Sequence, residues 1–337
     1  MSRLMSTIRV AILDDYQSVG LRADWSRVQQ RVAGIDVFTN TVLEEDALVA
    51  RLAPYHIVCA MRERTKFTKS LLDRLPNLRL IATTGMRNLG IDTEHAKAKD
   101  IVVSGTTAGS NSTLEHIWAI IFATVRHIAH EDANIKAKKP QWQTYVPMEL
   151  SGQTIGLIGV GRLGTHAAVI AKAFGMRVVG WSPNLTPERA AEAGVEYAAT
   201  KADLLKQSDI VSLHMVLSDR TRHIIKAEDL ALMRPTAFFI NTSRGPLVDE
   251  AALIEVLRAK KIAGAGLDVY DIEPAMADAL PQLPLDHPLR ELDNVTLSPH
   301  NAYVSHKAYK GFWEQTVENI EAFLDGKPIR LGVNGIQ

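Results

Sequence analysis

Short apolar runs alternate with amphipathic stretches along almost the whole chain, and this alternation restricts the fold more than any other feature. Strand-like runs separated by helical patterns are typical of βα units, in which helices join parallel strands. One series of runs precedes residue 112, and a second follows residue 153. The runs lie at residues 8–13, 35–39, 56–61, 78–83, 101–105, 154–159, 177–182, 209–215, 237–243, 263–269 and 294–298. The sequence therefore predicts an α/β protein with two doubly wound parallel sheets.

Two longer helical stretches stand apart from these series. Residues 112–137 are predicted as one long helix, with Ser112 or Thr113 near its N-cap and apolar residues on more than one face. A helix that is apolar nearly all round is expected to be buried. The last helix is expected at residues 306–326, where Gly326 followed by Pro328 ends it.

Composition excludes several classes of protein. Lys plus Arg and Asp plus Glu are both 38, so a zero net charge gives no reason to expect a nucleic-acid partner. No apolar run approaches the roughly 18 residues that span a bilayer, and no signal-type apolar core opens the chain. The single Cys59 excludes an intrachain disulfide framework and is expected to be a buried, inert thiol. His127 and His130 are three residues apart on one predicted helix, but no third ligand at a metal-binding spacing is evident, so no metal site is expected. We expect a cytoplasmic protein without a membrane partner.

A glycine-rich motif opens the second series. Gly159, Gly161 and Gly164 form a GxGxxG pattern after the strand-like run 154–158 and before a helical pattern. This context favours a dinucleotide site over an ordinary strand-to-helix turn, which is the alternative. The first glycine allows the tight turn, the second lets the backbone approach the pyrophosphate, and the third permits close helix packing. Arg162 can add a charge-assisted bond to the same phosphates.

Three polar residues follow successive strand-like runs in the second series. Arg244 stands in NTSRG, Glu273 in GLDVYDIEP and His300 in LSPHNA. Because ligands bind at the carboxyl ends of parallel strands, these side chains can converge beside a bound nicotinamide. Taken one at a time, each can also be an ordinary surface residue.

Together, these residue types suit the reduction of a 2-keto acid. The cofactor supplies hydride, and the developing alkoxide needs a proton. Histidine, with an ordinary pKa of roughly 6.5, can provide that proton, and a neighbouring glutamate favours the imidazolium form. Arginine offers a planar fork that can bind the substrate carboxylate and polarise the keto oxygen.

At these motifs the chain resembles the D-isomer-specific 2-hydroxyacid dehydrogenase family, in particular glyoxylate and hydroxypyruvate reductases and phosphoglycerate dehydrogenase. The segments that carry the resemblance, in the family's order, are GVGRLG, SDIVSLHMVLSDRTRHII, FINTSRGPLVDEAAL, AGAGLDVYDIEP, DHPL and LSPHNA. The resemblance implies a Rossmann cofactor domain at residues 109–301, inserted into a discontinuous flavodoxin-like substrate domain formed by residues 1–108 and 302–337.

The resemblance also implies roles for individual residues. Arg244, Glu273 and His300 match the family's catalytic set, and Asp268 is expected to hold the nicotinamide carboxamide. Other expected cofactor contacts are Gly159, Gly161, Arg162, Leu163, Gly164, Ser182, His214, Thr221, Thr242 and His300. The expected substrate contacts are Arg62, Gly85, Met86, Arg244 and His300. His116, in the first turns of the long helix, could touch the site, but it is expected to serve packing.

The chain departs from the family pattern at three places. Ser182 stands where an acid usually binds the ribose 2′-hydroxyl, so either NAD or NADP is expected, with weak discrimination. Val216-Leu217 replaces the usual proline, and the loop between Glu273 and Asp286 is longer than usual. Glyoxylate, hydroxypyruvate and related keto acids are all candidate substrates, since the pocket depends on side chains such as Met86 and Trp313.

Two alternatives share this fold. Formate dehydrogenase pairs its histidine with glutamine. This chain has Glu273 instead, which disfavours that alternative. A dinucleotide-sensing, corepressor-type binding protein can retain the catalytic set.

The apolar helix from Ser112, with Ile117, Trp118 and Ile121 among its residues, predicts burial against a second subunit and hence a homodimer.

Overall fold

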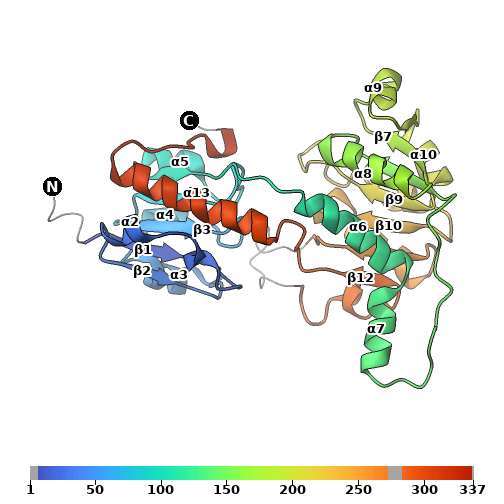
Figure 1. The fold of residues 1–337 in the computed structure, drawn as a ribbon, viewed down its shortest axis with the longest axis horizontal. Helices are drawn as coiled ribbons and strands as arrows, with labels where there is room; N and C mark the ends of the chain where they lie inside the picture. Colours follow the sequence, from blue (N-terminus) through green and yellow to red (C-terminus); the bar gives the residue numbers. More distant parts are fainter. Residues whose placement is uncertain (1–6, 272–282, 336–337) are drawn as a thin grey trace. The chain divides into compact units, whose positions relative to one another are not determined.

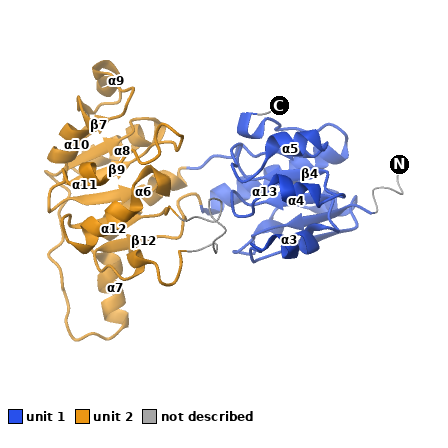
Figure 2. Ribbon diagram, turned by 180° about the vertical axis from the view of Figure 1, so that it is seen from behind, with its two compact units in different colours: residues 1–110, 273–282, 304–337 blue, residues 111–272, 283–303 orange. Residues whose placement is uncertain are grey.

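The computed structural model describes residues 7–271 and 283–335, and these fall into two compact units. Unit 1 contains described residues 7–110 and 304–335, and unit 2 contains residues 111–271 and 283–303 (Figure 2). Each unit is a parallel sheet covered by helices on both faces (Figure 1). The predicted fold class, two doubly wound parallel-sheet α/β domains, is confirmed.

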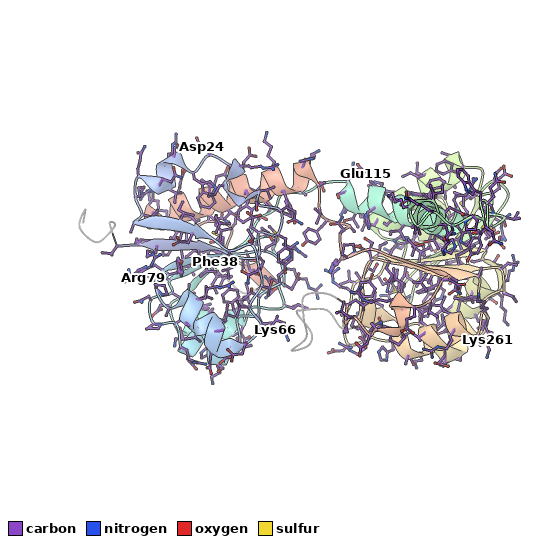
Figure 3. The ribbon with its side chains drawn as sticks, turned by 90° about the horizontal axis from the view of Figure 1, so that it is seen from below. Asp24, Phe38, Lys66, Arg79, Glu115 and Lys261 are labelled. Carbon is purple, nitrogen blue, oxygen red and sulfur yellow. The ribbon has the colours of Figure 1, made fainter. Side chains whose placement is uncertain are left out.

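Unit 1 is built on a five-stranded parallel sheet with strand order β2-β1-β3-β4-β5, the order of flavodoxin-like folds. Its strands are β1 Arg9–Ile12, β2 Gly34–Val37, β3 Ile57–Ala60, β4 Leu80–Thr83 and β5 Val102–Ser104. Its helices are α2 Ser26–Gln29, α3 Glu45–Leu52, α4 Lys69–Asp73, α5 Thr93–Ala98 and α13 His306–Leu324, with short 3-10 turns at Gly20–Arg22 and Val333–Gly335. Helices α2 and α13 cover one face, and α3, α4 and α5 cover the other (Figure 3).

Two of the sequence predictions concern residues that lie in the core of unit 1. Cys59 is 1% exposed in the middle of β3, so the expected burial of its thiol is confirmed, and this burial raises the pKa of the thiol. Trp313 on α13 is 2% exposed and belongs to the core. Because a buried ring can still shape a pocket from behind, the expectation that Trp313 helps to shape the substrate pocket stays a prediction.

Unit 2 is built on a seven-stranded parallel sheet with strand order β12-β11-β10-β9-β6-β7-β8. Its strands are β6 Thr154–Ile158, β7 Arg177–Trp181, β8 Glu196–Tyr197, β9 Ile210–Leu213, β10 Phe238–Asn241, β11 Gly264–Leu267 and β12 Val295–Leu297. Its helices are α6 Ser112–Val125, α7 Ile128–Lys136, α8 Arg162–Ala173, α9 Pro187–Glu192, α10 Lys201–Gln207, α11 Ala227–Leu230 and α12 Glu250–Arg258, with 3-10 turns at Gly245–Leu247 and Pro288–Arg290. This is the Rossmann order, with the direction of strand addition reversing between β6 and β9.

Two apolar layers hold the sheet of unit 2, one on each face. Alternate residues of a strand point to opposite faces, so Phe239 of β10 packs with α10, α11 and α12, whereas Phe238 and Ile240 pack with α6, α8 and α9. The strand residues of both layers come from the predicted strand-like runs. The short edge strand β8 was not predicted.

The predicted long helix from residue 112 to 137 is wrong in one respect, because it is two helices. His127 adopts a left-handed backbone conformation with φ 53°, which ends α6 and starts α7. Its ring stacks on Tyr145, with ring centroids 3.9 Å apart and the planes at 7°. The break between α6 and α7 thus coincides with the tertiary contact between His127 and Tyr145, which helix propensity alone does not indicate.

The apolar residues of α6 are buried, as predicted, but unit 2 itself buries them. Ile117 and Ile121 are 0% exposed and Trp118 is 5% exposed, and the helix packs on β10, β11, β12 and α8. A second subunit is therefore not needed to cover α6. The argument from α6 to a homodimer fails for this reason.

Candidate active site

The glycine motif forms the turn between β6 and α8. Gly159 has φ +103°, and a Cβ on it would lie 2.6 Å from the carbonyl oxygen of His214. A Cβ on Gly164 would lie 2.2 Å from the carbonyl oxygen of Gly159. A Cβ on Gly161, in contrast, would meet nothing within 4 Å. Two of the glycines are thus required by the chain itself, and the third leaves open space over the turn.

Helix α8 begins at this open space. Gly161 is its N-cap and offers no side-chain cap, so the first backbone N–H groups lack the usual side-chain partner. Arg162 is exposed, and Leu163 is half-buried. The turn lies beside the point where strand order reverses between β6 and β9, the usual ligand crevice of such sheets. Free N–H groups, the helix dipole and Arg162 suit an anion such as a pyrophosphate.

The loop after β9 carries His214 and Thr221. The backbone N–H of His214 donates to Ile158 at 2.8 Å, which places the residue beside the fingerprint turn. Its Nε2 is shut off from solvent without a hydrogen-bond partner among the described residues. Burial lowers the pKa of His214 to about 4, so the ring is neutral near pH 7. Thr221 braces the loop, since its hydroxyl donates to the carbonyl of Val216 at 2.7 Å and accepts from the N–H of Ser218 at 2.8 Å.

The loop after β7 carries Ser182, which is half-buried directly beyond Trp181. Its carbonyl accepts a hydrogen bond from the N–H of Leu185 at 3.1 Å. The segment 182–187 contains no carboxylate. Arg189, on the first turn of α9, reaches back so that Nη1 lies 3.3 Å from the carbonyl oxygen of Asn184. A guanidinium rather than an acid therefore lies against this loop.

The loop after β10 is organised by Asn241, whose side chain donates to the carbonyl of Arg244 at 3.1 Å and accepts from the N–H of Ser243 at 3.0 Å. Ser243 ties the same loop to β9 through a 2.7 Å bond to the carbonyl of Leu213. Arg244 is half-buried, and its Nη1 donates to the carbonyl of Ser243 at 2.7 Å. The hydroxyl of Thr242 is buried and has no partner in the described part of the chain.

Contacts join this loop to the next two. A Cβ on Gly245 would lie 1.8 Å from the carbonyl oxygen of Tyr270, so the loops after β10 and β11 are packed backbone to backbone. The hydroxyl of Tyr270 donates to the carbonyl of Ser298 at 2.8 Å, which ties the loop after β11 to the loop after β12. The loops that carry Arg244 and His300 thus flank the loop after β11, and both are in contact with it. Glu273, the third predicted catalytic residue, lies outside the described residues.

Asp268 is the anchor of the loop after β12. Its carboxylate is 0% exposed and accepts from the N–H groups of Asn301 at 2.7 Å and Ala302 at 3.0 Å, and from the hydroxyl of Ser298. His116 Nε2 lies 3.1 Å from the same carboxylate. Burial opposes ionisation, but the hydrogen bonds outweigh it and hold the pKa of Asp268 below its usual value.

Two features of this loop were not anticipated from sequence. His300 is half-buried and has φ 52°, and its ring stands edge-on to Tyr303 at 5.9 Å. The expectation that His116 serves packing is wrong, because its ring bonds to polar atoms. The sequence signal for this role is that His116 is a polar residue in the first turns of an apolar helix. That signal does not indicate its partner Asp268, which lies 152 residues away in the sequence.

The predicted substrate residues lie in unit 1, beyond the carboxyl ends of β3 and β4. Arg62 has φ 51°, and its Nη1 lies 3.3 Å from the carbonyl oxygen of Thr84. Gly85 has φ +90°, which favours glycine, and a Cβ on it would lie 2.1 Å from Nη1 of Arg62, so a side chain there would displace the guanidinium. The N–H of Gly85 already donates to the hydroxyl of Thr106 at 2.8 Å. Met86 is half-buried, and its carbonyl accepts from the N–H of Asn334 at 3.0 Å.

The comparison with known proteins now decides the family. The model described as "D-isomer specific 2-hydroxyacid dehydrogenase, NAD binding domain" matches residues 118–302. The chain belongs to this dehydrogenase family. Its sequence resemblance to the family is thereby confirmed, and the matched region contains the fingerprint turn, Arg244 and His300.

Relatives of this dehydrogenase-family chain agree. The D-3-phosphoglycerate dehydrogenase of Methanocaldococcus jannaschii is 34% identical over 315 residues, which cover 93% of this chain and 58% of that protein. The glyoxylate reductase of Thermococcus litoralis is 36% identical over 299 residues, covering 86% of this chain and 84% of that protein. The solved structure of a phosphoglycerate oxidoreductase from Vibrio cholerae O395 superposes with TM-score 0.87 at 34% identity, covering 95% of this chain and 99% of that one.

The residues of unit 2 fit the NAD(P) that this family binds. The open space at Gly161 and the uncapped start of α8 suit a pyrophosphate. Buried hydrogen-bonding atoms without partners, Thr242 Oγ1 and His214 Nε2, lie on the loops after β10 and β9. Among residues 7–271 and 283–335, no group of three or more His, Cys, Asp or Glu side chains is placed to bind a metal. Within the same ranges, no helix has both the length and the apolar character to cross a membrane.

Proposed function

We propose that this chain is an NAD(P)-dependent oxidoreductase that interconverts a small 2-keto acid and the corresponding D-2-hydroxy acid. The observation that carries the proposal is the junction of the loops after β10, β11 and β12. Arg244 and His300 stand on two of these loops, in the same unit as a turn that fits a dinucleotide. Residues 109–301 form the cofactor domain in this proposal, and residues 1–108 and 302–337 form the substrate domain.

Each proposed role follows from the chemistry of the residue. NAD(P)H supplies the hydride when bound. His300 donates a proton to the oxygen that becomes the hydroxyl, and Arg244 binds the carboxylate and polarises the keto oxygen. Glu273 is the proposed partner of His300, where its charge favours the imidazolium.

The remaining site residues hold the two ligands. Gly159, Gly161, Gly164, Arg162 and Leu163 hold the pyrophosphate, Ser182 meets the ribose, and His214, Thr221, Thr242 and Asp268 line the nicotinamide end. In unit 1, Arg62 and the backbone at Gly85 and Met86 bind the substrate. Since the N–H of Gly85 is already donated to Thr106, Met86 is the better placed of the two backbone groups.

A panel of 2-keto acids tests this function. Purified protein is mixed with NADH or NADPH and with glyoxylate, hydroxypyruvate, pyruvate or oxaloacetate, and the loss of cofactor absorbance is followed. At least one keto acid is expected to be reduced with kcat/KM of about 10⁴ M⁻¹s⁻¹ or more, and His300→Ala serves as the matched inactive control. If no keto acid is reduced while the cofactor still binds, a dinucleotide-sensing binding protein replaces the proposal.

We also propose a homodimer, on a ground other than α6. Apolar side chains remain exposed on α7 and on the segment after it, with Ile128 55%, Ile135 54%, Trp142 72% and Val146 99% exposed. A cluster of exposed large apolar residues is typical of a protein interface. Light scattering at micromolar concentration should give twice the chain mass. A monomeric mass would reject the proposal.

A further inference from the structure

The backbone at His300 is in a conformation that must be held in place. A left-handed φ of 52° is uncommon for a residue with a side chain, and it persists only where the surroundings enforce it. The N–H of His300 itself bonds to the carbonyl of Ser298 at 3.0 Å, which closes a tight turn. The direction of the proposed acid–base side chain therefore depends on what fixes residues 298–302.

The carboxylate of Asp268 fixes this turn from both sides. The hydroxyl of Ser298, before His300, donates to it, and the consecutive N–H groups of Asn301 and Ala302, after His300, donate to it as well. The side chain of Asp268 has no exposed surface, and the four donors to its carboxylate all belong to unit 2. Its carboxylate thus spans the residues on either side of the strained position.

Helix α6 supplies the second support. Nε2 of His116 lies 2.9 Å from Oγ of Ser298 and 3.1 Å from Oδ1 of Asp268. Because the Ser298 hydroxyl donates its own hydrogen to Asp268, Nε2 of His116 carries a hydrogen and donates to this pair. One turn earlier on the helix, the hydroxyl of Ser112 donates to the carbonyl of Ala302 at 2.8 Å. The first turns of α6 therefore contact both ends of the 298–302 turn.

We propose that His116 is a positioning residue for the reaction: its Nε2–H orients the Ser298–Asp268 pair and so holds the backbone of His300 in its left-handed conformation. This inference rests on the proposed function, in which His300 is the acid–base group. It needs only the N–H donor of His116, which both the neutral ring and the charged ring provide.

Paired variants at position 116 test the proposal. His116→Leu removes the donor and keeps much of the volume, whereas His116→Gln places an amide N–H at a similar reach. Glu115→Gln is the matched control, because Glu115 is the exposed neighbour in the same turn of α6 (Figure 3). For each variant, kcat and KM for the best keto acid, the NADH dissociation constant and the melting temperature are measured.

The expected result is a loss in kcat rather than in cofactor binding. His116→Leu should lower kcat about tenfold or more, because a small misplacement of a catalytic group is costly, while the NADH dissociation constant changes less than about threefold. His116→Gln should recover most of the loss, and Glu115→Gln should match the wild type. Unchanged kcat in His116→Leu overturns the proposal, and so do equal losses in the Leu and Gln variants with equal falls in melting temperature.

Two additions keep the test decisive. If His116→Leu does not fold, Ser298→Ala removes the acceptor instead and should lower kcat to a similar degree, whereas wild-type kcat in that variant overturns the proposal. The ring signal of His300 in ¹³C-histidine NMR, identified by its loss in His300→Asn, should shift in His116→Leu and not in Glu115→Gln. This signal needs no substrate, so an inactive wild type would reject the proposed function while the NMR result alone decides the positioning role.

Discussion

Replacing Gly161 by alanine should separate cofactor binding from folding. Its backbone, with φ −94° and ψ −162°, is extended and open to any residue, and a Cβ there would meet nothing within 4 Å. Where the native backbone suits alanine, Gly→Ala raises the free energy of unfolding by about 0.4–1 kcal/mol, because the unfolded chain loses freedom. Alanine is a poorer N-cap residue than glycine, which offsets this gain, so we expect a folded variant whose free energy of unfolding lies within about 1 kcal/mol of the wild-type value.

The substitution should instead weaken binding of the dinucleotide. The added methyl occupies the open space through which the pyrophosphate approaches the start of α8. Displacing the phosphates costs the equivalent of one hydrogen bond to a charged group, worth about 1.5–3 kcal/mol. With tenfold in affinity for each 1.4 kcal/mol, the NADH dissociation constant should rise roughly 10- to 100-fold.

Fluorescence titration with NADH and urea unfolding measure the two effects on the same samples. Gly164→Ala is the contrasting variant, because its Cβ would lie 2.2 Å from the backbone oxygen of Gly159 and no side chain can move to relieve the overlap. It should lower the free energy of unfolding by about 1–3 kcal/mol or more. If Gly161→Ala binds NADH as tightly as the wild type, the turn is not the pyrophosphate site.

Other predictions concern the catalytic loops, the cofactor and pH. His300→Ala should lower turnover roughly 100-fold or more in single-turnover assays, since positioned acid–base catalysis contributes about 10²–10⁴-fold; near-wild-type chemistry would remove His300 from its role. Arg244→Lys should be nearly as damaging as Arg244→Ala, because lysine lacks the planar fork; high activity in the lysine variant would reduce Arg244 to a point charge. The ratio of kcat/KM for NADH and NADPH should lie within roughly 100-fold, and Arg189→Ala should lower the value for NADPH more than that for NADH; a preference beyond about 1,000-fold contradicts this. His214 has a pKa of about 4 in the folded chain, below its unfolded value. Its contribution to the free energy of unfolding is therefore complete above about pH 6.5 and is lost as the pH falls towards 4, by about 3 kcal/mol in all. In urea unfolding, the free energy of unfolding of His214→Gln should depend less on pH over that range than that of the wild type.

Much of the fold could be predicted because it depends on local pattern. Parallel strands buried on both faces are nearly continuous apolar runs, so even a short strand such as β3 stands out. The edge strand β8, Glu196–Tyr197, carries no such run and was missed. The break at His127 was also missed, because a left-handed histidine packed on Tyr145 depends on a tertiary contact rather than on helix propensity.

In the candidate site, too, locally determined features could be predicted and long-range contacts could not. The fingerprint glycines could be placed from sequence, since their steric requirements belong to a local turn. The links among Asp268, Ser298 and His116 could not, because they join residues 30 to 182 positions apart. The same holds for Gly245, whose need to be glycine comes from the backbone of Tyr270 on another loop.

Isotope transfer tests the central claim most directly. Reduced cofactor that carries deuterium at both C4 positions of the nicotinamide is turned over with the best keto acid, and the hydroxy acid is analysed by mass spectrometry, NMR and chiral chromatography. If hydride passes directly to the keto carbon, the product carries one deuterium at C2 and, where that carbon is chiral, has the D configuration. A product without deuterium at C2, or one of L configuration, would contradict the proposed reaction.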